Sequence, residues 1–127
     1  MLEERKITHI LTVSKHINPK FPDKFEYQCI EVDDMPSENL SVHFLKGIKF
    51  IKSALDKGGR VLVHCAAGIS RSSTIVCAYL MQQNSWTFDK AWAYGQSKRA
   101  KMYPNSGFQS QLRIFEGQIF NKESNSI

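Results

Sequence analysis

The stretch "VLVHCAAGISRSS" (residues 61–73) decides how the fold is organised. The continuous apolar run over 60–65 has the length of a strand and is typical of one buried on both faces. A short turn of small residues follows, and the segment 72–84 is apolar almost all round, which predicts a buried helix. A strand, a short turn and a helix in direct succession predict an α/β layer fold.

Further strands and helices are predicted on both sides of this unit. The apolar and β-branched residues fall at strand or helix spacing, Gly58 and Gly59 are expected to end the first helix, and Thr87 is expected to cap a later one. The predicted ranges are strands over 7–14 and 25–32, helices over 41–57, 87–99 and 108–120, and a fraying tail over 121–127. We therefore expect one α/β domain over 1–127, with helices packed on a central, mostly parallel sheet.

Composition suits a globular protein of the cell interior. The hydrophobic fraction of 42% and the charged fraction of 23% are ordinary, and no apolar run is long enough to span a membrane. The first residues lack the apolar core of a signal peptide, and the three cysteines are odd in number and have no metal-ligand spacing. We expect a cytoplasmic location, with the nucleus as an alternative, and buried thiols at Cys29 and Cys77.

The segment that follows the apolar strand can bind an anion. The carboxyl ends of parallel strands are where open α/β sheets place their ligands, and Cys65 stands there. Backbone N–H groups of the short loop and the positive end of the next helix favour negative charge. Gly68 permits backbone conformations that a side chain resists, and Arg71 offers a planar fork of donors for two phosphate oxygens. Together these groups predict a cradle for a tetrahedral dianion.

The same surroundings should activate the thiol. A helix N-terminus and a nearby cation favour the thiolate, so we expect Cys65 to attack the phosphorus of a bound monoester. The cradle and Arg71 would neutralise the phosphate oxygens, so neither a metal nor another cofactor is expected. The alternative is a buried structural cysteine beside an ordinary turn, which the full "HC-x-x-G-x-x-R-S" string disfavours. A disulfide between Cys29 and Cys65 would require the second strand to bring them close.

The leaving oxygen needs a proton from a neighbouring carboxyl group. The segment "DDMPSEN" (33–39) follows the second strand, so it should emerge at the same edge of the sheet as Cys65. Asp33 and Asp34 are both candidates, and Asp33 is favoured as the bystander. The alternative for each is a solvated or capping loop aspartate.

The motif "VLVHCAAGISRS" resembles the active-site signature of the cysteine-based protein phosphatases, and of their dual-specificity branch in particular. The segments "ITHILTVS", "NLSVHFLKGIKFI" and "YPNSGFQSQLRIFE" look like that branch in the same order, so the resemblance covers almost the whole chain. It implies that Cys65 is the nucleophile and Arg71 the phosphate clamp. Counting back from "N-L-S" favours Asp34 as the general acid.

The resemblance also implies supporting roles. Ser72 would donate to the cysteine sulfur, with a plain helix cap as its alternative. His64 would orient the loop, and Asn105 would brace the cradle; a core histidine and simple turn chemistry are the alternatives. The cradle would be the backbone of Ala66, Ala67, Gly68, Ile69, Ser70 and Arg71.

One segment of the family pattern does not precede "ITHILTVS" here. Family members usually carry an N-terminal hairpin and helix, and that hairpin lies beside the strand that ends in the catalytic cysteine. Without it, one edge of the strand over 60–65 would lack a partner, and bare apolar edges invite pairing with another chain. We therefore expect this edge to be covered, by residues before Ile7, by an upstream segment or by a second copy in a homodimer.

The resemblance and the short length together predict a phosphatase of phosphotyrosine and of phosphoserine or phosphothreonine. Strict phosphotyrosine enzymes of the superfamily have longer domains with a deeper pocket. Two alternatives remain: a phosphatase of phosphoinositides or RNA ends, and a phosphosite-binding module of low activity. The loop "AAGIS" has no lysine for further phosphates, and Cys65, Arg71 and Asp34 are all present. Phosphorylated proteins are the expected partners, without nucleic acid or membrane.

Overall fold

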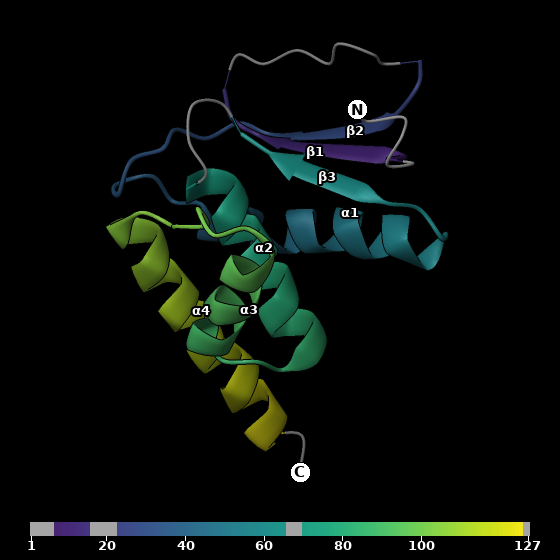
Figure 1. Cartoon of the computed structure of the whole chain (residues 1–127). Helices are drawn as coiled ribbons and strands as arrows, with labels where there is room; N and C mark the ends of the chain where they lie inside the picture. The colour runs from purple at the N-terminus through teal and green to yellow at the C-terminus, as the bar shows by residue number, and fades with distance from the viewer. Residues whose placement is uncertain (1–6, 16–22, 66–69, 126–127) are drawn as a thin grey trace.

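In the part of the chain that the structure describes, three parallel strands form the sheet, in the order β2-β1-β3 (Figure 1). The computed structural model describes residues 7–15, 23–65 and 70–125. The strands are β1 (His9–Val13), β2 (Glu26–Ile30) and β3 (Val61–His64). Thr12 of β1 pairs with Cys29 of β2 on one side and with His64 of β3 on the other. The predicted parallel sheet is confirmed, and all three strands end at one edge.

The central strand is buried and its neighbours are less so. Every residue of β1 is buried, whereas every residue of β3 is only half-buried. The expectation that β3 is buried on both faces is therefore wrong. The reason is its position: among the described residues β3 pairs with β1 alone, so it is an edge strand.

Four α-helices lie together on one side of the sheet in Figure 1. They are α1 (Phe44–Asp56), α2 (Ser70–Asn84), α3 (Phe88–Lys98) and α4 (Ser106–Asn125), and a short 3₁₀ helix, η1 (Ser41–His43), leads into α1. The Thr87 cap is confirmed, because Thr87 Oγ1 accepts a hydrogen bond from Lys90 N at 3.2 Å. Within the described residues, no helix combines the length and the apolar character that crossing a membrane would need.

Two helix ends differ from the sequence-based ranges. Helix α2 begins at Ser70 rather than Ser72, so Arg71 lies in its first turn and not in the preceding loop. Helix α4 begins at Ser106, two residues early, and continues to Asn125, so most of the tail expected to fray is helical. The added residues after Phe120 include Lys122 and Glu123, which favour helices, and this explains why polarity alone did not end α4.

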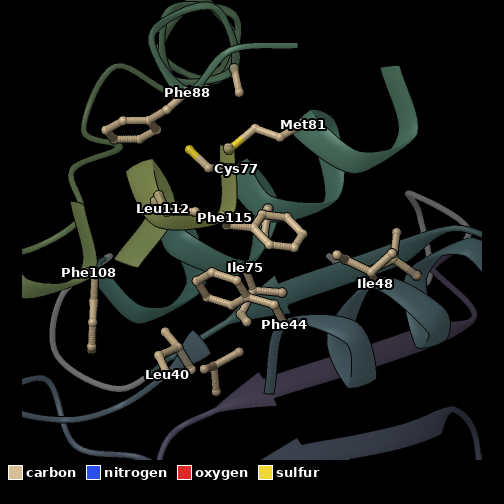
Figure 2. Packing of buried hydrophobic residues seen from close by; sticks show 14 of the residues in the cluster. Leu40, Phe44, Ile48, Ile75, Cys77, Met81, Phe88, Phe108, Leu112 and Phe115 are labelled. Carbon is tan, nitrogen blue, oxygen red and sulfur yellow. The ribbon is translucent and has the colours of Figure 1, made fainter. Parts of the chain in front are cut away.

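The hydrophobic core joins the sheet to all four helices (Figure 2). Leu11 and Val13 on one face of β1 belong to the same cluster as residues of every helix. The rings of Phe44 in α1 and Phe115 in α4 meet edge to face, with centroids 5.1 Å apart. Burial of these aromatic rings fixes α1 and α4 relative to one another, and so fixes the segment before α1 relative to the start of α4.

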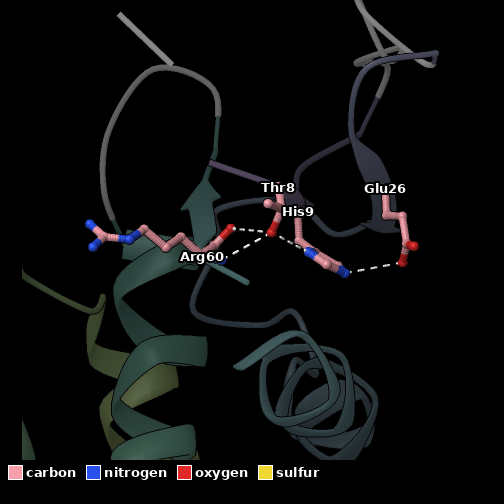
Figure 3. A network of polar contacts seen from close by, with 4 residues as sticks. All are labelled: Thr8, His9, Glu26 and Arg60. Carbon is pink, nitrogen blue, oxygen red and sulfur yellow. Dashed lines mark hydrogen bonds and ion pairs between the residues drawn. The ribbon is translucent and has the colours of Figure 1, made fainter. Parts of the chain in front are cut away.

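Polar contacts tie the strands together at the opposite edge, where they begin (Figure 3). Thr8 Oγ1 accepts a hydrogen bond from Arg60 N at 3.0 Å and lies 2.7 Å from His9 Nδ1. The other ring nitrogen, His9 Nε2, lies 3.1 Å from a Glu26 carboxylate oxygen. These contacts link the first residues of β1, β2 and β3. They help to set the strand register, which decides which residues meet at the carboxyl edge.

Candidate active site

The thiol of Cys65 lies at the carboxyl end of β3, beside the first turn of α2. Cys65 directly follows His64, the last residue of the strand, and its side chain is half-buried. Its Sγ lies 3.4 Å from the Oγ of Ser72, a residue that is only 4% exposed. Ser72 is the third residue of α2, so the alternative of a plain helix cap is wrong. Its hydroxyl is placed to donate to a thiolate.

Arg71 lies beside this pair and is buried. Its side chain is 8% exposed, and Nη1 donates a hydrogen bond to the backbone oxygen of Val32 at 3.0 Å. Val32 follows β2 and immediately precedes the two candidate acids. Arg71 therefore joins the start of α2 to the segment that carries the two candidate acids. A guanidinium offers five N–H donors, so this contact uses only part of its capacity.

Part of the expected cradle can be placed. Ala66, Ala67, Gly68 and Ile69 lie outside the described residues. Ser70 is buried; its Oγ accepts a hydrogen bond from Asn105 N at 2.7 Å, and its carbonyl accepts one from Thr74 Oγ1 at 2.7 Å. The end of the cradle is thus attached both to α2 and to the residue that precedes α4.

Asn105 connects the cradle to Asp34. Besides the contact with Ser70, its Nδ2 donates to Asp34 Oδ1 at 2.9 Å, and its Oδ1 accepts from Phe108 N at 2.9 Å. The last bond caps α4, whereas the contact with the cradle residue Ser70 is made by the backbone N–H of Asn105. Asp34 is exposed, which leaves its carboxyl group open to a substrate.

Asp33 points to another partner. Its Oδ2 accepts a hydrogen bond from Lys15 Nζ at 3.0 Å, and this bond raises the pKa of Lys15 above its ordinary value. The ion pair joins the segments after β1 and β2. The two neighbouring aspartates therefore have different surroundings: Asp33 is paired with a cation, and Asp34 is attached to the residue that holds the cradle.

The sequence and the fold both match a known protein family. Residues 1–118 match the family model described as "Dual specificity phosphatase, catalytic domain". The chain belongs to the dual specificity phosphatase family. Dual specificity protein phosphatase 1B of Arabidopsis thaliana is 48% identical over 118 residues, which cover 93% of this chain and 71% of that protein.

Two further similar proteins show how much of the chain the similarity covers. MAP kinase phosphatase with leucine-rich repeats protein 1 of Dictyostelium discoideum is 43% identical, over 93% of this chain but only 14% of that protein. The crystal structure of the human tyrosine phosphatase-like serine/threonine/tyrosine-interacting protein is 37% identical, with a TM-score of 0.89 over 94% of this chain and 82% of that one. The dual specificity phosphatase fold is thus shared along nearly the whole chain.

The histidine of the phosphatase signature is held from the central strand. His64 Nε2 lies 2.9 Å from the Oγ1 of Thr12, a residue that is 2% exposed. The two residues are direct partners in the β1–β3 pairing, so their side chains lie on the same face of the sheet. His64 is thereby fixed next to Cys65, and Thr12 is a supporting residue that the sequence motif did not reveal.

The structure separates Cys29 from the active-site cysteine. Cys29 pairs with Thr12, and Thr12 pairs with His64, the residue before Cys65. Strand β1 therefore lies between Cys29 and the strand that leads to Cys65, and two interstrand spacings amount to about 10 Å. A disulfide needs Cα atoms within about 7 Å, so the pairing considered from the sequence is wrong for this fold. Cys29 is also half-buried rather than buried, because β2 is an edge strand. Cys77 is fully buried, as expected.

Two further contacts of the phosphatase site lie outside its signature. Gly107 in α4 lies against Pro36, and Gln111 binds the backbone of residues 38–41 through three hydrogen bonds. The "SGF" string offered a weak signal for Gly107, whereas no local pattern marks Gln111. Among the described residues, no group of three or more His, Cys, Asp or Glu side chains is placed to hold a metal ion.

Proposed function

We propose that this domain hydrolyses phosphotyrosine and phosphoserine or phosphothreonine in proteins through a phosphocysteine intermediate. Family membership supports a hydrolase of the dual specificity type. The observation that carries the proposal for this chain is that Cys65 lies beside Ser72 in the first turn of α2, while Arg71 and Asn105 link the start of α2 to the segment of Asp34. The activity of the whole protein is likewise proposed here, because the chain spans only a small part of the length of some relatives.

The first half of the reaction transfers the phosphoryl group to sulfur. The Cys65 thiolate attacks phosphorus, a sulfur–phosphorus bond forms, and the bond from phosphorus to the leaving oxygen breaks. The Asp34 carboxyl group gives its proton to that oxygen, so the product leaves as a neutral hydroxyl. Arg71 and the backbone at the start of α2 stabilise the charge on the other phosphate oxygens.

The second half returns the enzyme to its starting state. The Asp34 carboxylate takes a proton from water, the water oxygen attacks phosphorus, and the sulfur–phosphorus bond breaks. Inorganic phosphate and the Cys65 thiolate are released. Ser72, whose Oγ lies 3.4 Å from the sulfur, donates a hydrogen bond to the departing thiolate.

Cys65→Ser tests the covalent mechanism. The variant should lose turnover of an aryl phosphate but keep oxyanion binding, because a hydroxyl is too weakly acidic to attack while Arg71 and the backbone donors remain. Turnover and vanadate binding would be measured on the same preparation, with and without a chelator. Retained activity in the serine variant would contradict a cysteine nucleophile, and activity lost to the chelator and restored by a divalent ion would point to metal catalysis.

The substrate class is tested separately. The relatives include a MAP kinase phosphatase and a protein phosphatase Slingshot homolog. These names support phosphorylated proteins as substrates. A panel of phosphopeptides, a phosphoinositide and a triphosphorylated RNA end would rank the classes. Preferential turnover of the lipid or the RNA would favour the alternative of a non-protein phosphate ester.

A phosphosite-binding role is the second candidate. One solved relative, with 37% identity and a TM-score of 0.89, is named a tyrosine phosphatase-like, interacting protein. Tight binding of a phosphopeptide with negligible turnover by the unaltered chain would favour this role. The presence of Cys65, Arg71 and Asp34 favours catalysis.

Location and assembly complete the proposal. A cytoplasmic or nuclear location is supported by an odd number of cysteines without metal-ligand spacing, which suits a reducing compartment. Imaging of a fluorescent fusion tests it. Among the described residues β3 pairs on one side only, which supports coverage of its other edge by another strand, with a homodimer as one route.

A further inference from the structure

Helix α4 contacts the segment that carries Asp34 at several points. This segment, residues 33–41, is named here the acid segment. Asn105, just before α4, donates to the Asp34 carboxylate at 2.9 Å. In the first turn of α4, a Cβ on Gly107 would collide with the backbone of Pro36, so the two backbones are in direct contact. The third point is Gln111, one turn further along α4.

Gln111 holds the far end of the acid segment by its side-chain amide. Its Oε1 accepts hydrogen bonds from Leu40 N at 2.8 Å and from Ser41 N at 2.9 Å. Its Nε2 donates to the carbonyl of Glu38 at 2.8 Å. Leu40, at the N-cap of η1, has no side chain that can cap the helix. The amide of Gln111 therefore satisfies the first N–H groups of η1 from a distant part of the chain.

The restraint continues from Glu38 back to the aspartates. Glu38 Oε1 accepts a hydrogen bond from Asp33 N at 2.7 Å, and Glu38 N donates to Met35 O at 3.0 Å. These bonds close the segment between Asp33 and Glu38 into a turn with Asp34 inside it. The position of Glu38, which Gln111 holds by its carbonyl, thus limits where the carboxyl group of Asp34 can lie.

We propose that Gln111 is a positioning residue for the general acid Asp34. This inference rests on the proposed function. Gln111 binds the backbone of the acid segment rather than the Asp34 carboxyl group; it acts by fixing Glu38, Leu40 and Ser41, and through them the turn that presents Asp34. Proton transfer to a leaving oxygen depends on placement within hydrogen-bond reach, so losing this anchor should impair the acid step more than nucleophilic attack.

The test replaces Gln111 by a side chain of the same length without hydrogen-bonding groups. Gln111→Met is compared with Gln118→Met, because Gln118 lies two turns further along α4 and lines the same surface groove. Phenyl phosphate, with a poor leaving group, and p-nitrophenyl phosphate, with a good one, report on the acid. Gln111→Met should lose roughly 10- to 100-fold in kcat/KM for phenyl phosphate, with little change in kcat/KM for p-nitrophenyl phosphate, because kcat/KM reports only the steps up to transfer of the phosphoryl group to sulfur. Gln118→Met should match the unaltered protein on both.

A double variant separates positioning from general stability. When Asp34→Asn is already present, adding Gln111→Met should cause no further loss on phenyl phosphate, because the acid that Gln111 places is gone. The limb of the pH profile of kcat/KM for phenyl phosphate that depends on the acid should be weakened in Gln111→Met and lost in Asp34→Asn. Equal losses in kcat/KM on both esters, or additive losses in the double variant, would overturn the inference.

A second variant covers the case in which Gln111→Met does not fold. Gly107→Ala pushes Pro36 away from α4 and should produce the same selective loss on phenyl phosphate, whereas loss on both esters would count against α4 as the support of the acid. If Cys65→Ser retained activity, the proposed function would fail. If Cys65 and Asp34 behaved as proposed while Gln111→Met matched Gln118→Met, only the present inference would fail.

Discussion

At the scale of single residues, the two adjacent aspartates are separated by their contacts rather than by their type. Asp33 is held by Lys15, and Asp34 by Asn105, which also contacts Ser70 at the end of the cradle. The carboxyl group of Asp33 is thus paired with a cation, whereas that of Asp34 is attached to the residue that contacts the cradle. The contacts favour Asp34 for the acid step.

Replacing Asp34 by Asn should slow esters with poor leaving groups far more than activated aryl phosphates. A good leaving group departs without protonation, so it has little need of the acid. General acid catalysis typically contributes roughly 10²–10⁴-fold, so the difference between phenyl phosphate and p-nitrophenyl phosphate should be large. The kcat/KM value of both esters is measured for Asp34→Asn and, as the matched control, Asp33→Asn, because kcat/KM does not include hydrolysis of the phosphocysteine. A selective loss in the Asp33 variant would move the role to that residue.

At the scale of elements, helix α2 serves the site and the core at once. Its first turn supplies Arg71 and Ser72, and its middle buries Ile75, Cys77 and Met81 against the other helices. Burial raises the pKa of the Cys77 thiol to about 12. The two cysteines near α2 should therefore differ in chemistry, with Cys65 reactive and Cys77 inert.

The raised pKa of Cys77 predicts a loss of stability at alkaline pH. The unfolded thiol ionises near its ordinary value of 9.0, while the folded thiol stays neutral up to about 12, so unfolding releases a proton between these values. The free energy of unfolding should fall by about 1.4 kcal/mol at pH 10 from this group, since one pKa unit corresponds to about that energy. Urea unfolding at pH 8 and pH 10 measures the decrease.

The control for this prediction is Cys77→Ala beside Cys29→Ala. The Cys77 variant should be less stable at neutral pH, because the sulfur leaves a small cavity, but its stability should depend less steeply on pH above 9. Cys29 is only half-buried, so Cys29→Ala should keep the steep dependence. If the free energy of unfolding fell equally steeply with pH in the unaltered protein, Cys77→Ala and Cys29→Ala, Cys77 would not be the cause of the decrease.

At the scale of the whole molecule, the edge of β3 that faces away from β1 has backbone groups that need hydrogen-bond partners. Alternate N–H groups of a parallel strand point to opposite neighbours, so some of those over Val61–His64 point to this edge. A buried backbone donor without a partner costs about 1–3 kcal/mol, which is a large share of the stability of a small domain. We expect the edge to be covered.

Residue-resolved hydrogen exchange at Val61, Leu62 and Val63 measures that coverage. All three amides should exchange slowly, not only those bonded to β1. Size-exclusion chromatography with light scattering then shows whether a second copy supplies the cover: a dimer that protects these amides supports the homodimer, and a monomer with the same protection assigns the cover to another segment. Rapid exchange at alternate positions in a monomer would show an open edge.

The sequence by itself determined the strand–turn–helix unit and marked Cys65 and Arg71 as the candidate nucleophile and clamp. Strand, small-residue loop, Arg71 and helix are contiguous, so local pattern and motif were enough to predict them. A mostly parallel sheet was also expected, because strands followed by a strand–helix crossover predict an α/β layer fold. The same local reasoning placed Thr87 as a helix cap.

Only the tertiary structure decided what holds these parts in place. Gln111 and Leu40 are 71 residues apart, as are Asn105 and Asp34, and no local periodicity relates such positions. The exposure of β3 and the separation of Cys29 from Cys65 depend on the strand order β2-β1-β3. Apolar composition indicates that a strand is buried, but strand order decides which strands have a neighbour on only one side among the described residues. Contacts between distant segments form only when the packed core of Phe44 and Phe115 brings α4 against the segment before α1.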